Sequence, residues 1–265
     1  MSRFSLHLGA VCALFASLGC GSQQENVPST VTYTRDIAPI LYENCAPCHR
    51  PGESGPFPLL SYTDARKRAR QIADVAAARY MPPWKPEPGY GEFVGARRLT
   101  DAQIVLLQRW AEGDTPEGDP AHLPPSPTWN EGWQLGEPDL IVEMPQAYTL
   151  AAGDGDVFRN FVIPLPLTQR RYVRALELRP GNPQVVHHAV IMMDRDGVAR
   201  NQDARDAEPG FGGMEFGEVQ RPGGHFLGWA PGTTPYVVPD SLAWTLEAGN
   251  DLVLQLHMLP SGKPE

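Results

Sequence analysis

Residues 43–52 read ENCAPCHRPG, in which Cys45 and Cys48 are separated by two residues and followed at once by His49. Two thiols at this spacing can add to the two vinyl groups of a haem, and the neighbouring imidazole can bind its iron. A thioredoxin-type pair does not need the histidine, and a structural zinc site needs a second pair of ligands nearby, which this sequence does not offer. The motif therefore predicts a covalently attached haem c.

Cysteine usage supports the same interpretation. The sequence has four cysteines, of which Cys12 and Cys20 lie in the N-terminal segment, so Cys45 and Cys48 remain for the folded body. An exported chain with two cysteines forms either one disulfide or two thioethers to haem. His49 favours the thioethers.

The first twenty residues have the character of an export signal. The apolar run from Leu8 to Leu18 is too short to span a bilayer as a mature helix. Residues 17–20 resemble a bacterial lipoprotein cleavage site, except that a serine occupies the usual leucine position; an ordinary secretory signal is the alternative. We expect residues 1–20 to be a signal peptide, Cys20 to carry a lipid anchor, and residues 21–30 to form a tether. The protein is thus predicted to be exported, and periplasmic or anchored to the outer membrane of a Gram-negative-type bacterium.

The charge balance excludes one class of partner. The chain has 22 basic and 31 acidic residues, a net charge of −9 and a pI near 5.3. Because no basic patch offsets this acidity, we expect no nucleic-acid partner.

Segments with helical spacing of apolar residues surround the haem motif. The predicted helices cover residues 34–41, 61–80 and 100–113. Pro82 and Pro83 end the second helix and hold Met81 on an extended loop, where its thioether could be the sixth ligand of the iron. The alternative is a methionine that packs in the core. Residues 31–116 are predicted to form a small all-α domain like that of a c-type cytochrome.

The pattern changes after a proline-rich segment, residues 117–138, which is predicted to be a linker between domains. Short β-prone runs separated by Gly, Pro and Asn turns follow, at residues 140–142, 161–163, 172–178, 185–193 and 252–256. Residues 139–265 are therefore predicted to form an all-β sandwich of the jelly-roll type. Residues 194–224 are expected to be a surface excursion.

Three histidines of this second region could bind a metal. His187 and His188 are adjacent, and neighbouring side chains of a strand face opposite ways, so they can share one ion only if the backbone bends or the strand lies at an edge. Considered alone, the pair favours one histidine directed inward and the other in solvent, and His257 in its apolar strand favours a hydrogen-bonded core residue. Together the three would form an imidazole-only site suited to copper or zinc. His225 is a fourth possible ligand without a spacing argument.

Several stretches of the second region resemble the N-terminal half of the copper type II, ascorbate-dependent monooxygenases, the relatives of peptidylglycine hydroxylating and dopamine β-monooxygenases. These stretches are residues 182–188 (NPQVVHH), 228–232 (GWAPG) and 251–257 (DLVLQLH). In that family a His-His pair and a later His in an LQxH strand bind one electron-transfer copper. The resemblance implies that His187, His188 and His257 bind copper here. The elements CAPCHRPGE, GPFPL and YMPPWKP of the first region are similar to the cytochrome c-like domain that precedes this module in some bacterial proteins.

The resemblance implies a redox function. The haem would receive electrons, from a redox partner protein or a small reductant, and pass them to the copper. The family binds oxygen at a second copper in a further β domain, of which this sequence has no trace, so hydroxylation of an organic substrate is an expectation for a complete parent and no catalytic residue is identified in this chain. Two alternatives stay open: an anchored monohaem electron carrier with a docking module, and a copper-binding or sensing module without catalysis.

Overall fold

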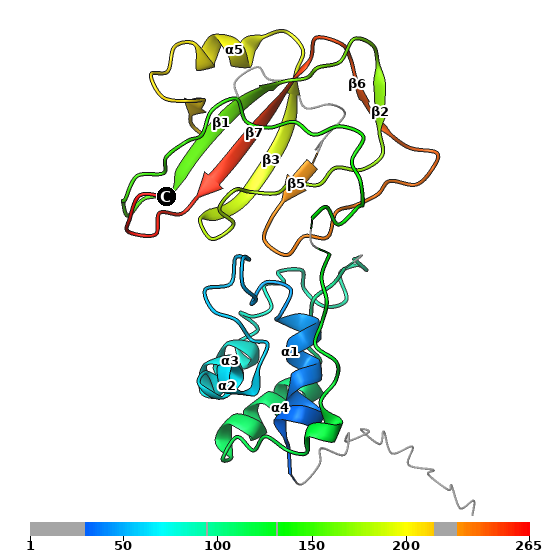
Figure 1. Ribbon diagram of the computed structural model, residues 1–265, viewed down its shortest axis with the longest axis vertical. Coiled ribbons are helices and arrows are strands. Elements are labelled where there is room, and N and C mark those ends of the chain that lie inside the picture. Colours follow the sequence, from blue (N-terminus) through cyan, green and yellow to red (C-terminus); the bar gives the residue numbers. More distant parts are fainter. Residues whose placement is uncertain (1–29, 94, 131, 215–226) are drawn as a thin grey trace, which may run out of the picture.

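The computed structural model describes residues 30–93, 95–130, 132–214 and 227–265, which form a helical part and a sheet part stacked end to end (Figure 1). The predicted signal peptide, nearly all of the predicted tether, and the residues Cys12, Cys20 and His225 lie outside these ranges. Among the described residues, every helix is too short or too polar to cross a membrane.

Short helices make up the ordered elements of the first part. They are the π-helix Tyr33–Ile37, α1 (Ala38–Asn44), α2 (Tyr62–Arg66), α3 (Ala69–Ala77), α4 (Asp101–Glu112) and the 3-10 turn Pro120–His122. A capping box begins α4, since Thr100 accepts from the Gln103 backbone and the Gln103 side chain accepts from the Thr100 backbone. The apolar faces of α1, α3 and α4 enclose Trp110 and Tyr33 in one buried cluster.

The segment predicted to be one helix over residues 61–80 is two helices. The backbone at Arg68 is not helical (φ −125°, ψ 13°), and α3 begins at the next residue. The predicted helices at residues 34–41 and 100–113 are confirmed.

The second part is built on one antiparallel sheet of five strands in the order β4-β1-β7-β3-β5. Its strands are β1 (Val157–Pro164), β3 (Val186–Asp194), β4 (Phe211–Gly212), β5 (Leu227–Trp229) and β7 (Asp251–Met258). Strands β2 (Arg171–Val173) and β6 (Trp244–Leu246) form a separate pair, and helix α5 (Val198–Asp203) follows β3. All eight residues of β7 are buried, because this strand lies between β1 and β3 and both of its faces are covered.

The predicted fold class, an all-α cytochrome domain followed by an all-β sandwich, is wrong. The five α-helices of the described residues have only 5–12 residues each, and long irregular segments rich in Pro and Gly separate α1 from α2 and α3 from α4, so no all-α cytochrome domain is evident. The second part is not all-β, because helix α5 packs on one face of the five-stranded sheet, where Ala199 is buried in one cluster with Val162, Val253 and Phe211 of the edge strand β4. Residues 140–142 form no strand, and residues 194–214 contribute to the core instead of only a surface excursion.

The segment between the two parts is packed along much of its length. Pro116 accepts hydrogen bonds from the backbone of Tyr33 and the indole of Trp110. Further along, Trp129 lies under the guanidinium of Arg50, next to the haem motif, and Trp133 lies under Arg179 of the sheet part. The predicted linker is therefore attached to both parts.

A buried polar pair fixes the sheet beside β4. The side-chain amide of Gln255 on β7 donates to Asn160 on β1 (3.0 Å), and it also reaches the carbonyls of Gly213 and Met214. Asn160 is fully buried and in turn donates to Phe211 and Gly213. This network holds the segment after β4 on the sheet face that carries Gln255.

The substitution Gln255→Met should lower the free energy of unfolding by about 2 kcal/mol, because it keeps the volume but leaves the buried Asn160 oxygen without its donor. Chemical denaturation of the metal-free chain measures the change. Gln169→Met, at an exposed position, is the matched control and should change stability by less than about 0.5 kcal/mol. Equal stabilities of the two variants would show that the network contributes nothing.

Candidate metal centre

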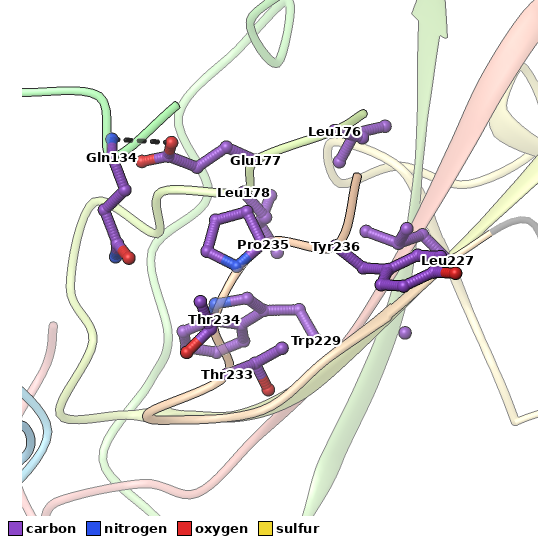
Figure 2. A pocket seen from close by; sticks show the side chains of 11 residues that line it. Gln134, Leu176, Glu177, Leu178, Leu227, Trp229, Thr233, Thr234, Pro235 and Tyr236 are labelled. Carbon is purple, nitrogen blue, oxygen red and sulfur yellow. Dashed lines mark hydrogen bonds between the residues drawn. The ribbon is translucent and has the colours of Figure 1, made fainter. Parts of the chain in front are cut away.

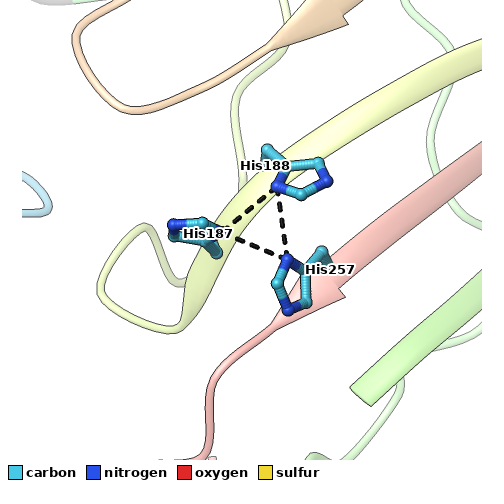
Figure 3. Close-up of side chains that lie close together, drawn as sticks. All are labelled: His187, His188 and His257. Atoms are coloured by element: carbon cyan, nitrogen blue, oxygen red, sulfur yellow. Dashed lines mark hydrogen bonds between the residues drawn. The ribbon is translucent and has the colours of Figure 1, made fainter. Parts of the chain in front are cut away.

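His187, His188 and His257 meet at one end of the sheet, where β3 begins and β7 ends (Figure 3). The pairing of β3 with β7 shifts between Val186 and His188: Val186 lies opposite Met258, and His188 lies opposite His257. His187 is thus the extra residue of a β-bulge. Because a bulge breaks the alternation of side chains, both neighbouring histidines turn toward His257. A bend of the backbone was one of the two conditions under which two adjacent histidines of a strand could share one ion, and the bulge meets it.

The three Nδ1 atoms form a nearly equilateral triangle. The separations are 3.1 Å between His187 and His257, 3.2 Å between His187 and His188, and 3.3 Å between His188 and His257. Two nitrogen ligands of one tetrahedral ion, each about 2.0–2.1 Å from it, are about 3.3–3.4 Å apart. The triangle therefore has the size of one face of a metal coordination sphere.

Hydrogen bonding alone cannot account for this triangle. An imidazole nitrogen carries either a proton or a lone pair in the ring plane, so each Nδ1 can donate or accept but not both. With three such atoms in mutual contact, at least one pair must place two protons or two lone pairs face to face. A cation between three neutral rings accepts all three lone pairs and removes the conflict, and imidazole ligands suit copper or zinc.

Asp156 and Phe158 orient the ring of His257. The Nε2 atom of His257 lies 3.0 Å from the Oδ2 atom of Asp156, so it is placed to donate its proton to this carboxylate. A proton on Nε2 leaves the lone pair on Nδ1, directed at the other two histidines. The ring of Phe158 stacks on His257, with centroids 4.1 Å apart and planes 9° from parallel.

The surroundings of His188 favour its neutral form. Partial burial lowers the pKa of its imidazole below the usual value, and the neighbouring His257 and His187 lower it further. A neutral ring is the form that binds metal.

Asp156→Ala should weaken Cu²⁺ binding by about tenfold or more, because His257 loses the acceptor that fixes its tautomer. A competition titration against a chelator of known affinity measures the change. Asp154→Ala, which removes a nearby exposed carboxylate, is the control and should leave the affinity unchanged. Equal losses in both variants would reduce the role of Asp156 to general negative charge.

The cysteine motif lies in turns at the end of α1. Cys45 is the C-terminal cap of this helix, and the backbone amides of Cys48 and His49 donate to the Cys45 carbonyl (3.1 and 2.9 Å). The His49 Nδ1 atom lies 3.1 Å from the carbonyl of Phe57. A proton on Nδ1 satisfies that carbonyl and leaves the Nε2 lone pair for a metal, the arrangement typical of a metal-binding histidine.

The two thiols are free and fit covalent attachment of a haem. Burial, with a smaller contribution from Cys48, raises the pKa of Cys45 to about 12, so this thiol stays protonated at neutral pH. The donor set of two thiols and one imidazole with a free Nε2 is the set that a c-type haem requires.

Met81 follows α3 by four residues, and its backbone amide donates to Val75 (3.1 Å). With Trp84 and Arg97 it lines a small cavity of about 20 Å³. The guanidinium of Arg97 donates to the carbonyl of Gly232, and a Cβ atom added at Gly232 would lie 2.7 Å from the Cys48 sulfur. Met81 and Cys48 therefore lie beside the same arginine, and ligation of the iron by Met81 stays a prediction.

Sequence reasoning missed Asp156 and Phe158. Asp156 belongs to a Gly- and Asp-rich stretch that favours a turn, and the contact with His257 spans 101 residues. The pairing of β1 with β7, which places Phe158 opposite His257, is visible only in the folded chain.

No protein-family model matches this chain, and a search of curated proteins found no match. The resemblance to copper monooxygenases and bacterial cytochromes therefore stays a prediction.

Proposed function

We propose that this protein is a one-electron redox protein that binds one copper ion through His187, His188 and His257 and one haem c through Cys45, Cys48 and His49. The observation that carries the proposal is the triangle of Nδ1 atoms, whose edges of 3.1–3.3 Å match ligands of one ion. Of the metals that suit three imidazoles, copper is favoured by the resemblance to the copper monooxygenases.

Copper and haem, when bound, would each gain or lose one electron at a time. Neighbouring residues of the chain fix the orientation of the proposed ligands. Asp156 and Phe158 hold the His257 ring in the orientation that ligation needs, and Phe57 does the same for His49 through its carbonyl. Such fixed ligands limit rearrangement when the charge of the metal changes.

We propose electron transfer, not hydroxylation, as the activity of the described residues. Among them, one group of three or more His, Cys, Asp or Glu side chains is arranged to hold a metal, and it is the histidine triangle. A monooxygenase of the type that the sequence resembles uses a second copper for oxygen. Hydroxylation is accordingly a proposal for this chain acting together with such a site.

The chain, exported in a bacterial host that attaches haem c and then supplied with copper, should contain one iron and one copper per molecule. His257→Ala should lose at least nine-tenths of the copper and keep the haem, since two imidazoles on a bulged strand are a poor site without the third. Metal analysis and the absorption spectrum of the haem after denaturation measure both contents.

The control variant is His122→Ala, which removes an exposed histidine of the helical part and should keep full copper and haem. Equal copper in the His257→Ala and His122→Ala proteins would contradict the copper site. Haem without any copper would support the alternative of an anchored electron carrier with a docking module. Copper without covalent haem would contradict the assignment of Cys45 and Cys48.

A further inference from the structure

The haem motif and the metal-bearing sheet touch at the turn Ala230–Thr233, directly after β5. The turn is closed by two hydrogen bonds, from the Thr233 backbone to the Ala230 carbonyl (2.9 Å) and from the Ala230 backbone to the Thr233 hydroxyl (3.1 Å). Gly232 within it has a φ of +77°, which favours glycine. The turn is thus a fixed feature of the sheet part.

Cys48 and Arg97 of the helical part pack directly on Gly232. A Cβ atom at this position would lie 2.7 Å from the Cys48 sulfur and would also overlap the Arg97 guanidinium. Arg97 donates to the Gly232 carbonyl over 3.2 Å, a bond that joins residues 135 positions apart. Only a glycine allows this approach without displacing one of its neighbours.

The sheet part supports the turn from behind. Trp229, Thr233, Thr234 and Pro235 line a cavity of about 60 Å³, together with Glu177 and residues on either side of it (Figure 2). The carboxylate of Glu177 accepts from the backbone amides of Gln134 (2.7 Å) and Leu135 (3.1 Å), which belong to the segment between the parts. The turn therefore stands between the haem motif and a wall of the sheet part.

The same turn continues into the strand next to the histidine triangle. Trp229, the last residue of β5, pairs with Ala189 on β3, and Ala189 follows His188. A contiguous series of contacts consequently runs from the Cys48 sulfur through Gly232 and β5 to the first residues of β3.

We propose that Arg97 and Gly232 are positioning residues that dock the haem motif on the metal-bearing sheet, and that electron exchange between haem and copper depends on this contact. The proposal rests on the proposed function. One electron would leave the ferrous haem and reduce the cupric ion to the cuprous state, so the exchange needs no further reactant. Coupling between two sites through a packed contact requires a direct test, because adjacency alone does not establish it.

The first test uses the chain without haem or copper and does not depend on redox activity. Alkylation of Cys48 by a maleimide, followed by mass spectrometry of the peptide, should be at least fivefold faster in Gly232→Ala than in the unaltered chain. The matched control is Gly249→Ala, which has a similar φ of +81° but no atom within 4 Å of the added Cβ. It imposes the same backbone strain without the overlap and should leave alkylation unchanged. Equal rates in the two glycine variants would overturn the docking contact.

A second pair of variants keeps the test valid if Gly232→Ala does not fold. Arg97→Gln removes the bond to the Gly232 carbonyl, whereas Arg98→Gln removes a contact within the helical part, to the Pro86 carbonyl. Only the first should accelerate alkylation of Cys48.

In the protein loaded with haem and copper, Arg97→Gln should slow the oxidation of ferrous haem by the cupric site at least tenfold, measured after rapid reduction of the haem. The Cu²⁺ electron paramagnetic resonance spectrum and the haem absorption should stay unchanged, as expected of a residue that positions two sites without binding either metal. An unchanged rate in Arg97→Gln, with alkylation accelerated, would show that docking does not govern electron exchange and would overturn that half of the proposal. A chain that binds no copper would contradict the proposed function, while the alkylation test would still decide the docking.

Discussion

An imidazole nitrogen cannot carry a proton and a lone pair in its ring plane at the same time, and this constraint is the reason to place a metal at the histidine triangle. Three Nδ1 atoms within 3.1–3.3 Å of one another cannot all form hydrogen bonds among themselves. The conflict is removed when one cation receives three lone pairs. Asp156 supports this state, because its carboxylate accepts a hydrogen bond from Nε2 of His257. The single ring proton of the neutral imidazole is then on Nε2, and Nδ1 keeps its lone pair.

The sheet places the three rings by means of one irregularity and one buried strand. The bulge at His187 turns two adjacent side chains toward His257, which lies on β7, a strand that is buried along its whole length. The face of β7 that carries His257 also carries Gln255, whose bonds to Asn160 and the chain after β4 fix the neighbouring backbone. Buried and hydrogen-bonded residues therefore support the histidine triangle, although His187 itself is exposed.

The sequence predicted the grouping of His187, His188 and His257 better than the fold. Helices near residues 34–41 and 100–113 and the long strands that carry the histidines follow from local spacing of apolar residues, and they are present. The fold class did not follow, because the packing of α5 on one sheet face and the pairing of β4 with β1 depend on contacts between residues distant in sequence. The bulge could be stated only as a condition, since adjacent histidines in a strand do not reveal whether the register shifts. Asp156 lay in a stretch with the composition of a turn, and 101 residues separate it from His257.

The central claim is that three imidazoles bind one metal, and X-ray absorption at the copper edge tests it most directly. The protein loaded with one equivalent of Cu²⁺ should show nitrogen ligands near 2.0 Å, as in other imidazole sites, with the multiple scattering of three imidazole rings. After reduction to Cu⁺, the three rings should remain. A first shell with one imidazole or none, or copper bound through oxygen alone, would contradict the account.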